Sequence, residues 1–316
     1  MRILVGHNHY QQSGGEDAVF RSETQVLSSL GHEVYPYERD NGELARKLNF
    51  INPFSFGWSR RSYNDVRSMI RRFRPQIAHF HNIFYMMTPS VYEACRDEGV
   101  AVVQSLHNYR IFCLNGLLFR DGCPCEDCLR ISPYEGVRHR CFRGSWLASF
   151  FFSRWLEQYR HKKIWTRNID RFIVATEFTK GKYIEAGIPA GAISVKPHFV
   201  EDPGKPKEIQ QRKHALFIGR LSHEKGIKTL LEAWKGIKDL PLYIMGKGPM
   251  EAQIKEYIRT YKLDNVVLLC STDRQIYQDL MRQAKFIIIP SLCYENFPRV
   301  VVEAFAYGVA VLASRR

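Results

Sequence analysis

The sequence has no long hydrophobic run, and this absence excludes a membrane-spanning helix. A span requires roughly 18 to 20 uncharged apolar residues, and the longest apolar run near position 150, Trp146 to Phe152, is far shorter. The N-terminus also lacks the apolar stretch and small-residue cleavage site of a signal peptide. We therefore expect a cytoplasmic protein. The 45% hydrophobic content of the 316 residues is that of a globular chain with about two domains.

Acidic residues are scarce relative to basic ones, with 32 against 46, which gives a net charge of +14. Two stretches hold most of the excess: 58–74 has six arginines against Asp65, and 138–167 has eight basic residues against Glu157. Such a concentration favours an anionic partner, namely phosphates, a membrane surface or nucleic acid. A solvated basic face without a partner explains the same charges equally well.

Short apolar runs alternate with longer amphipathic segments along almost the whole chain, without internal repeats or low-complexity tracts. The strand candidates are 3–5, 33–37, 77–80, 100–106, 171–175, 193–196, 215–218, 242–245, 266–269, 286–289 and 309–312. The helix candidates are 16–30, 62–73, 89–98, 177–187, 224–237, 249–261, 273–283 and 298–307. This alternation predicts an α/β fold of doubly wound, Rossmann-like domains, with helices on both faces of parallel sheets.

The alternation pauses at 201–214, a polar stretch that contains proline and glycine, and it restarts there with a fresh strand. We therefore expect a first domain at 1–198, a linker at 199–213 and a second domain at 214–316. A long insertion at 110–145 interrupts the first domain, and its length suggests a function or a structural staple.

Five of the eight cysteines fall within this insertion. Four of them have the spacing C-x11-C-x2-C-x12-C, and Cys123 is left over; the four are Cys113, Cys125, Cys128 and Cys141. Four thiolates can complete a tetrahedral structural zinc site, which would hold a long insertion in shape in a reducing compartment. Reduced structural thiols and redox-labile thiols are the alternatives, and an iron–sulfur cluster fits the same residues less economically.

In parallel α/β sheets ligands bind at the carboxyl ends of strands, so the strand-to-helix loops are the first candidates for a site. Gly14 and Gly15 lie in the first such loop, where a glycine backbone can approach a ligand and a helix N-terminus favours an anion. The first loop of the second domain carries Arg220 and Lys225 around a helix start, a pair that can clamp a diphosphate. The alternative for the glycine loop is a plain tight turn, and the alternative for Arg220 and Lys225 is two solvated side chains without a ligand.

A further loop follows the strand at 286–289 and carries Glu295, with Pro298 at the expected first turn of a helix and Glu303 inside it. A carboxylate can accept hydrogen bonds from neighbouring hydroxyls of a sugar or ribose ring. The two glutamates offer such acceptors at two depths, although each alone is equally compatible with a surface position.

Together these elements resemble the retaining glycosyltransferases of family 4, which have the GT-B fold. The matching elements are Gly14–Gly15, His107 after a strand, Gly219–Arg220 with Lys225–Gly226, and a glutamate pair spaced E-x7-E in a segment ending EAFAYG. The resemblance covers essentially the whole chain, and the glutamate pair with the Arg/Lys loop is its most specific part. It implies two Rossmann-like domains that face each other across a cleft.

The resemblance implies an enzyme that transfers a sugar from a nucleotide-sugar donor to a glycan or lipid-linked acceptor. The transfer would retain the anomeric configuration, need no obligatory divalent metal and serve polysaccharide or glycolipid biosynthesis. Arg220 and Lys225 would bind the donor diphosphate, where charge develops on the leaving group. Glu303 would hold the ribose, and Glu295 and His107 would contact the reacting sugar. The residues implied as donor-binding are Gly14, Gly15, Arg220, Lys225, Asn296, Phe297, Pro298 and Glu303.

The chain departs from the family pattern in three places. Asn108 follows His107 where many members have Asp, and Pro298 stands where many have Gly. Members also continue past the strand at 309–312, so we expect a truncated second domain with an unpaired sheet edge. The alternative functions are an inactive fragment that binds only donor, a nucleotide-sugar epimerase, and a nucleic-acid-binding module that uses the basic face.

Two further patterns stand outside the loops. The segment 146–167 mixes aromatic with basic residues, so as a helix it would suit an anionic membrane surface and place the protein at the inner face of a membrane. Aromatic side chains in the core and charges in solvent are the alternative. His79 and His81 alternate on a strand, which suits metal ligation, but we expect hydrogen-bonded strand-end histidines instead.

Overall fold

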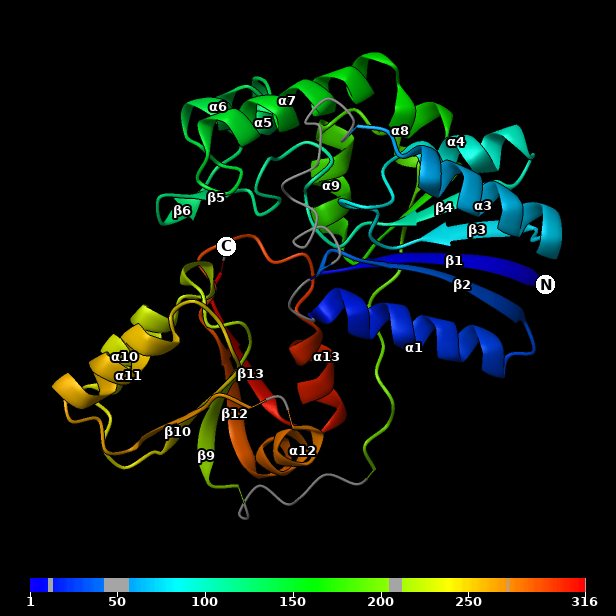
Figure 1. Ribbon diagram of the computed structural model, residues 1–316. Coiled ribbons are helices and arrows are strands. Elements are labelled where there is room, and N and C mark those ends of the chain that lie inside the picture. Colours follow the sequence, from blue (N-terminus) through cyan, green and yellow to red (C-terminus); the bar gives the residue numbers. More distant parts are fainter. Residues whose placement is uncertain (11–13, 43–56, 205–211, 272, 316) are drawn as a thin grey trace. The chain divides into compact units, whose positions relative to one another are not determined.

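A computed structural model describes residues 1–10, 14–42, 57–204, 212–271 and 273–315 (Figure 1). The chain forms two compact units. Unit 1 comprises Met1–Leu117 and Glu126–His198, and unit 2 comprises Leu118–Cys125 and Phe199–Arg316. Residues 205–211 of the predicted linker at 199–213 lie outside the described residues.

Unit 1 is built on a six-stranded parallel sheet with the order β2-β1-β3-β4-β7-β8. Its strands are β1 (Arg2–His9), β2 (Glu33–Asp40), β3 (Ile77–Phe80), β4 (Ala101–Ser105), β7 (Arg171–Val174) and β8 (Ile193–Val195). All six match predicted strands, but β1 runs four residues beyond the prediction and so carries His7 and His9 at its carboxyl end. This extension matters for the site described below.

Helices cover both faces of this sheet, as strand–helix alternation predicts. Figure 1 shows α1 on one face of β1 and β2, and α3 and α4 on the other. Phe20 of α1 packs against Ile3 and Val5 of β1, which fixes the helix on the sheet. The helices are α1 (Gly15–Ser29), α3 (Arg60–Phe73), α4 (Ser90–Asp97), α7 (Trp146–His161), α8 (Ile164–Arg167) and α9 (Glu177–Glu185).

The predicted insertion at 110–145 consists of short elements: β5 (Phe119–Arg120), β6 (Cys123–Pro124), α5 (Asp127–Arg130) and α6 (Glu135–Arg138). β5 and β6 pair in an antiparallel hairpin that belongs to unit 2. The helix α7 follows the insertion, and Ser145 caps it by accepting a hydrogen bond from the backbone N–H of Ala148 at 3.3 Å.

Unit 2 is built on a five-stranded parallel sheet with the order β11-β10-β9-β12-β13. Its strands are β9 (His214–Ile218), β10 (Leu242–Met245), β11 (Val266–Leu269), β12 (Ala284–Ile289) and β13 (Ala310–Ala313). Its helices are α10 (Ile227–Trp234), α11 (Glu251–Thr260), α12 (Arg274–Gln283) and α13 (Arg299–Ala306). Alternate residues of β9 enter different cores: Ala215 and Phe217 pack with α10 and α11, and Leu216 packs with α12 and α13.

No helix in the described part of the chain is both long enough and apolar enough to cross a membrane. The parallel sheets and the helices on their faces make each of the two units a Rossmann-like α/β domain.

Candidate functional site

Histidines gather at the carboxyl edge of the unit 1 sheet. Gly6 of β1 pairs in register with Phe80 of β3, and Phe80 pairs with Gln104 of β4. The residues that follow these positions therefore reach the same edge of the sheet. They include His7 and His9 after Gly6, His81 after Phe80 and His107 after β4.

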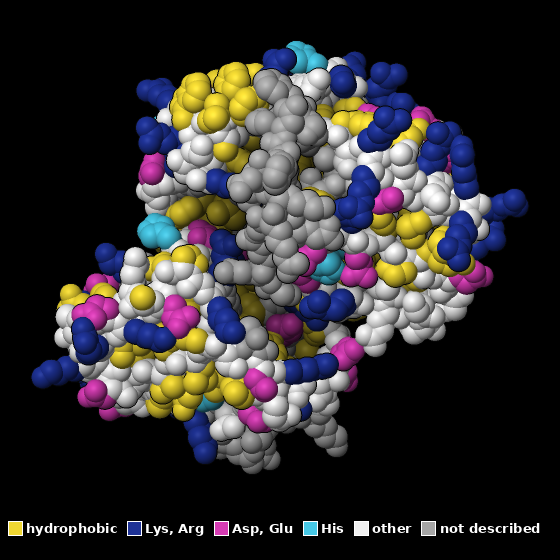
Figure 2. Space-filling model, viewed as in Figure 1, with side chains coloured by type: hydrophobic (Ala, Val, Ile, Leu, Met, Phe, Trp, Pro, Cys, Tyr) yellow, Lys and Arg dark blue, Asp and Glu magenta, His cyan; other side chains and the backbone are white. Residues whose placement is uncertain are grey.

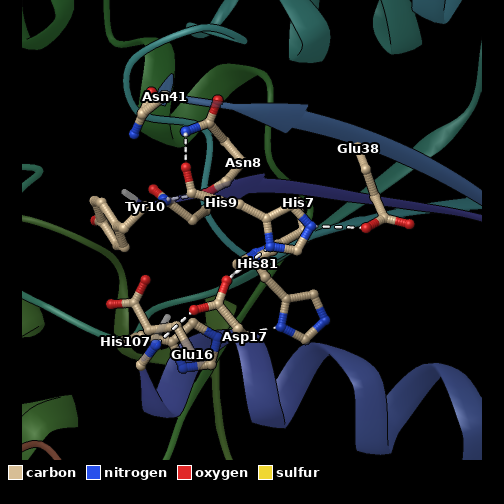
Figure 3. Close-up of polar contacts among 12 residues, drawn as sticks. His7, Asn8, His9, Tyr10, Glu16, Asp17, Glu38, Asn41, His81 and His107 are labelled. Atoms are coloured by element: carbon tan, nitrogen blue, oxygen red, sulfur yellow. Dashed lines mark hydrogen bonds and ion pairs between the residues drawn. The ribbon is translucent and has the colours of Figure 1, made fainter. Parts of the chain in front are cut away.

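Asp17 of α1 lies between two of these histidines (Figure 3). Its Oδ1 is 2.9 Å from His7 Nε2 and 2.8 Å from His9 Nδ1, and the other ring nitrogen of His9 is 2.7 Å from Glu38 Oε2. Burial opposes ionisation of Asp17, but the hydrogen bonds from His7, the Gly14 N–H and His9 hold its pKa well below the usual range. Burial also opposes protonation of His9, yet its two carboxylate partners raise its pKa. The hydrogen bonds of His9 to Asp17 and Glu38 therefore connect β1 to α1 and to β2.

The Gly14–Gly15 loop caps α1 in a way that the sequence did not predict. The backbone N–H of Gly14 donates to Asp17 Oδ2 at 2.7 Å, so this amide is already engaged. A Cβ added at Gly14 or Gly15 would meet no heavy atom of the described residues within 4 Å. Among the described residues, open space therefore borders both glycines, as the approach of a ligand requires; Ser13 lies outside these residues.

His107 belongs to a second histidine group. Its Nε2 is 3.1 Å from His81 Nδ1, and the opposite nitrogen of His81 is 3.7 Å from Glu23 Oε2. Lys196 in turn donates to Glu23. Burial, and then the charges on neighbouring histidines, lower the pKa of both His81 and His107 well below the usual value. His107 is therefore a neutral imidazole near pH 7.

His79 confirms the expectation of a hydrogen-bonded strand-end histidine, because its Nε2 lies 2.8 Å from Ser105 Oγ. Burial and the charge on Lys196 lower its pKa to about 4.

Glu16 lies beside this group on the first turn of α1. Its Oε1 accepts a hydrogen bond from Asn108 Nδ2 at 2.8 Å. Burial raises its pKa to about 7, although Asn108 and the Arg110 guanidinium act in the opposite direction. Asn108, which replaces the Asp common in the family, is thus a donor to a carboxylate rather than a second acidic group.

Two groups of side chains in unit 1 have metal-ligating atoms that all lie within 4.8 Å of one another. One is His7, His9 and Asp17, and the other is Glu23, His79 and His81.

The predicted zinc ligands Cys113, Cys128 and Cys141 all belong to unit 1, and Cys125 follows the β5–β6 hairpin in the segment Leu118–Cys125 of unit 2. A hydrogen bond with the Cys113 thiol, together with burial and the charge of Cys141, raises the pKa of Cys128. Cys113 and Cys128 are therefore neighbours in unit 1, and the zinc site stays a prediction. Cys123 is exposed and donates to the carbonyl of Arg120 at 3.4 Å.

In unit 2 the structure brings the predicted Arg/Lys loop next to the predicted glutamate loop. The backbone N–H of Leu292 donates to the carbonyl oxygen of Glu224 at 2.8 Å. Gly226 has a positive φ of 68°, and a Cβ there would lie 1.9 Å from the carbonyl oxygen of Pro290. Only glycine therefore allows this approach of the two loops.

Arg220 and Lys225 are both held by carboxylates. Arg220 Nη2 is 2.9 Å from Glu224 Oε1, and Lys225 Nζ is 2.6 Å from Glu295 Oε1. Burial opposes ionisation of Glu224, but hydrogen bonds from Ser222 and Arg220 lower its pKa. The arginine side chain is half exposed, so its guanidinium can exchange Glu224 for an incoming phosphate.

Glu303 lies on α13 and also has two partners. Its Oε1 is 3.0 Å from Arg299 Nε, one turn earlier on the same helix, and its Oε2 accepts from the hydroxyl of Tyr277 on α12. The helix begins at Arg299 with Pro298 as its N-cap, as the sequence predicted within one residue. Glu295 lies in the loop before it and Glu303 inside it, and the two side chains are equally exposed, at 22% each.

Sequence reasoning missed several of these residues. Asp17 and Glu23 follow the glycine pair on α1; Asp17 engages His7 and His9, and Glu23 lies beside His81. Glu16, on the same helix, accepts from Asn108 instead. An H-x-H pattern occurs at the end of both β1 and β3. That repeated pattern at one sheet edge was the signal that could have revealed the cluster.

Comparison with known proteins identifies both halves of the chain. Residues 13–202 match the family model described as Glycosyltransferase Family 4. Residues 200–316 match the model described as Glycosyl transferases group 1.

Two curated relatives align with about half of the chain each. An exopolysaccharide phosphotransferase of Streptomyces coelicolor is 30% identical over 150 residues, which cover 46% of this chain and 16% of that protein. A lipopolysaccharide 1,2-N-acetylglucosaminetransferase of Salmonella typhimurium is 29% identical over 173 residues, which cover 47% of this chain and 45% of that protein. The aligned part of this chain thus spans less than half the length of either relative.

A solved structure supports the fold. HepE of Anabaena, in complex with UDP and glucose, aligns with 99% of this chain and 80% of its own chain, with a TM-score of 0.62 and 15% sequence identity. The solved structures similar to this chain are GT-B glycosyltransferases, so the predicted fold class is confirmed. Because one family model alone covers more than half of the residues, the chain belongs to the glycosyltransferases that these two models describe.

Proposed function

We propose that the protein is a glycosyltransferase that moves a sugar from a nucleotide-sugar donor to a glycan or lipid-linked acceptor, with retention of the anomeric configuration. We assign this activity to polysaccharide or lipopolysaccharide biosynthesis, because the similar Salmonella protein is named a lipopolysaccharide N-acetylglucosaminetransferase. The HepE complex with UDP and glucose supports a nucleotide-sugar donor.

The observation that carries the proposal is the pairing of two loops in unit 2. Arg220 and Lys225 place two cations beside a loop that carries Glu295. A diphosphate offers several oxygens to these cations, and the loss of the nucleotide concentrates negative charge on those oxygens. The cations therefore stabilise the leaving group, and no resident metal ion is required for this step.

Glu303 and Glu295 have separate tasks in the proposal. Glu303 accepts hydrogen bonds from the ribose hydroxyls, and Tyr277 and Arg299 orient its carboxylate for that contact. Glu295 holds hydroxyls of the donor sugar, together with backbone groups of Asn296, Phe297 and Pro298.

His107 of unit 1 contacts the reacting sugar in this proposal. Its low pKa keeps the imidazole neutral, so the ring can accept a hydrogen bond from a sugar hydroxyl or donate one. The open space beside Gly14 and Gly15 suits the same ligand.

Saturation-transfer NMR on the full chain tests the proposal with UDP-, GDP-, ADP- and dTDP-sugars. We expect saturation transfer to the sugars of one nucleotide class, and its loss in Glu303→Ala. The matched control is Glu256→Ala, which removes an exposed carboxylate of the same unit that is paired with Arg259. Absence of transfer to all four classes from folded protein, or equal signals in Glu303→Ala, would contradict the proposal.

A further inference from the structure

The helix α7 is apolar on two sides. Its inward side consists of Ser149, Phe152, Ser153, Leu156 and Tyr159, all buried in unit 1. Its first two residues, Trp146 and Leu147, are nevertheless 55% and 58% exposed. A surface helix normally carries polar residues on its outer side, so these exposures need an explanation.

A neighbouring turn extends the exposed apolar surface. Tyr134, which precedes α6, is 39% exposed, and Ile131, three residues earlier, is 65% exposed. The ring of Phe150 lies 5.8 Å from that of Trp146 and 6.3 Å from that of Tyr134. The hydroxyl of Ser153 donates to the carbonyl of Pro133 at 2.9 Å and ties this turn to α7. The α7 patch is defined as Ile131, Tyr134, Trp146, Leu147 and Phe150.

Basic residues lie near the α7 patch along the chain. Residues 131–167 hold eight lysines and arginines but only two glutamates. Arg154 lies one turn after Phe150 on the same side of α7, and Arg138 and Arg140 follow the turn that carries Tyr134; all three are exposed. Figure 2 shows Lys and Arg side chains bordering hydrophobic surface on the visible face.

The later aromatic residues of this segment lie elsewhere. Tyr159 and Trp165 are buried, and their rings pack against each other at 5.8 Å. The expectation that the whole segment 146–167 could face a membrane is therefore wrong for its second half. Only the first two turns of α7 and the neighbouring turn carry an exposed apolar surface.

We propose that the α7 patch docks on an anionic phospholipid bilayer, with its apolar side chains in the interfacial layer and the surrounding arginines on lipid phosphates. Tryptophan and tyrosine favour the interface, and aliphatic side chains such as Leu147 and Ile131 gain from entering the acyl boundary. Nucleic acid offers no comparable environment for aliphatic side chains, and the nearby exposed arginines complement an anionic lipid surface. This inference goes beyond the proposed function and does not depend on donor binding.

Co-sedimentation of the full chain with vesicles tests the proposal. We expect binding to vesicles of phosphatidylglycerol and phosphatidylcholine, and little binding to phosphatidylcholine alone. The variant Trp146→Ser/Leu147→Ser should bind about tenfold more weakly, because it removes two inserting side chains. The matched control is Val26→Ser/Leu30→Ser, which alters two exposed apolar residues of the same unit, one on α1 and one at its C-cap, and should bind like the parent.

A second pair of variants separates the patch from general basicity. Arg140→Gln/Arg154→Gln should weaken vesicle binding and reduce its salt dependence, whereas Arg61→Gln/Arg72→Gln on α3 should not. Brominated phosphatidylglycerol should quench tryptophan fluorescence in the parent and less in Trp146→Phe.

Several outcomes would overturn the proposal. They are no binding to anionic vesicles, equal losses in the patch variants and their controls, and quenching that is unchanged in Trp146→Phe. Complete competition by an oligonucleotide at equal charge would assign the surface to nucleic acid instead.

Discussion

The two units hold their candidate residues in different ways. In unit 1 the polar groups are largely buried, and their pKa values depart from the usual range, as at Glu16, His79 and His107. In unit 2 the cations and carboxylates form partly exposed ion pairs, as at Lys225 with Glu295. Partly exposed pairs have little net stability, so a ligand can replace one partner at small cost. The polar groups of unit 1 are thus already fixed in position, whereas the ion pairs of unit 2 can open so that a charged ligand takes the place of one partner.

The largest expected effect comes from His107 in unit 1. His107→Ala should lower the turnover of the donor by about 100-fold or more while donor affinity changes little, because the residue contacts the reacting sugar only in the proposed chemical step. Single-turnover kinetics and nucleotide titration measure the two quantities separately. The control His161→Ala removes an exposed histidine of the same unit. An equal fall in affinity and rate would assign His107 to binding.

Glu303 should give the next largest effect. Glu303→Ala should weaken nucleotide-sugar binding by about 30-fold, since a carboxylate that accepts hydrogen bonds from two hydroxyls contributes roughly 2 kcal/mol. Isothermal titration calorimetry measures the change. Removal of the ribose from the ligand should make Glu303→Ala and the parent bind alike, and a persistent difference would place Glu303 elsewhere.

Tyr277 should give a smaller effect of the same kind. Tyr277→Phe removes the hydroxyl that donates to Glu303 but leaves the carboxylate and its Arg299 partner. Affinity should fall about threefold to fivefold, because the carboxylate keeps its Arg299 partner and loses only the hydroxyl that helps to orient it. If the loss equals that of Glu303→Ala, the hydroxyl itself contacts the donor.

The smallest expected effect concerns stability rather than binding. Glu16 has a folded pKa of about 7, above its unfolded value near 4.5, so its burial favours the protonated form. Its contribution to stability is present below pH 4.5 and is lost as the pH rises through 7. Glu16→Gln should therefore reduce the fall in melting temperature between pH 5 and pH 8. A parent and variant with parallel pH profiles would show that Glu16 ionises normally.

The sequence predicted the parts of the molecule that follow from local pattern. Short apolar runs and amphipathic segments located the strands of both sheets, since hydrophobic periodicity depends on neighbouring residues. The proline at position 298 located the start of α13 for the same reason. The loop glycine Gly226 matched a motif, and the structure adds that it allows the approach of Pro290.

What sequence reasoning missed depends on contacts between distant elements. The link from Glu38 through His9 to Asp17 joins β2, β1 and α1, and no spacing rule reveals it. Trp146 and Trp165 look alike in sequence, yet one is exposed and the other buried, because only packing decides which side of a helix faces the core. The pairing of Lys225 with Glu295 spans 70 residues.

The most direct test of the account is calorimetric titration of UDP, GDP, ADP and dTDP into the full chain and into Arg220→Ala. The account predicts that one nucleoside diphosphate binds the parent and binds Arg220→Ala about 30-fold more weakly. The variant lacks the guanidinium that, in the parent, leaves Glu224 and binds the phosphate. Arg259→Ala, which breaks a similar exposed ion pair on α11, should bind like the parent. Equal affinity of the parent and Arg220→Ala would contradict the assignment of the diphosphate to unit 2.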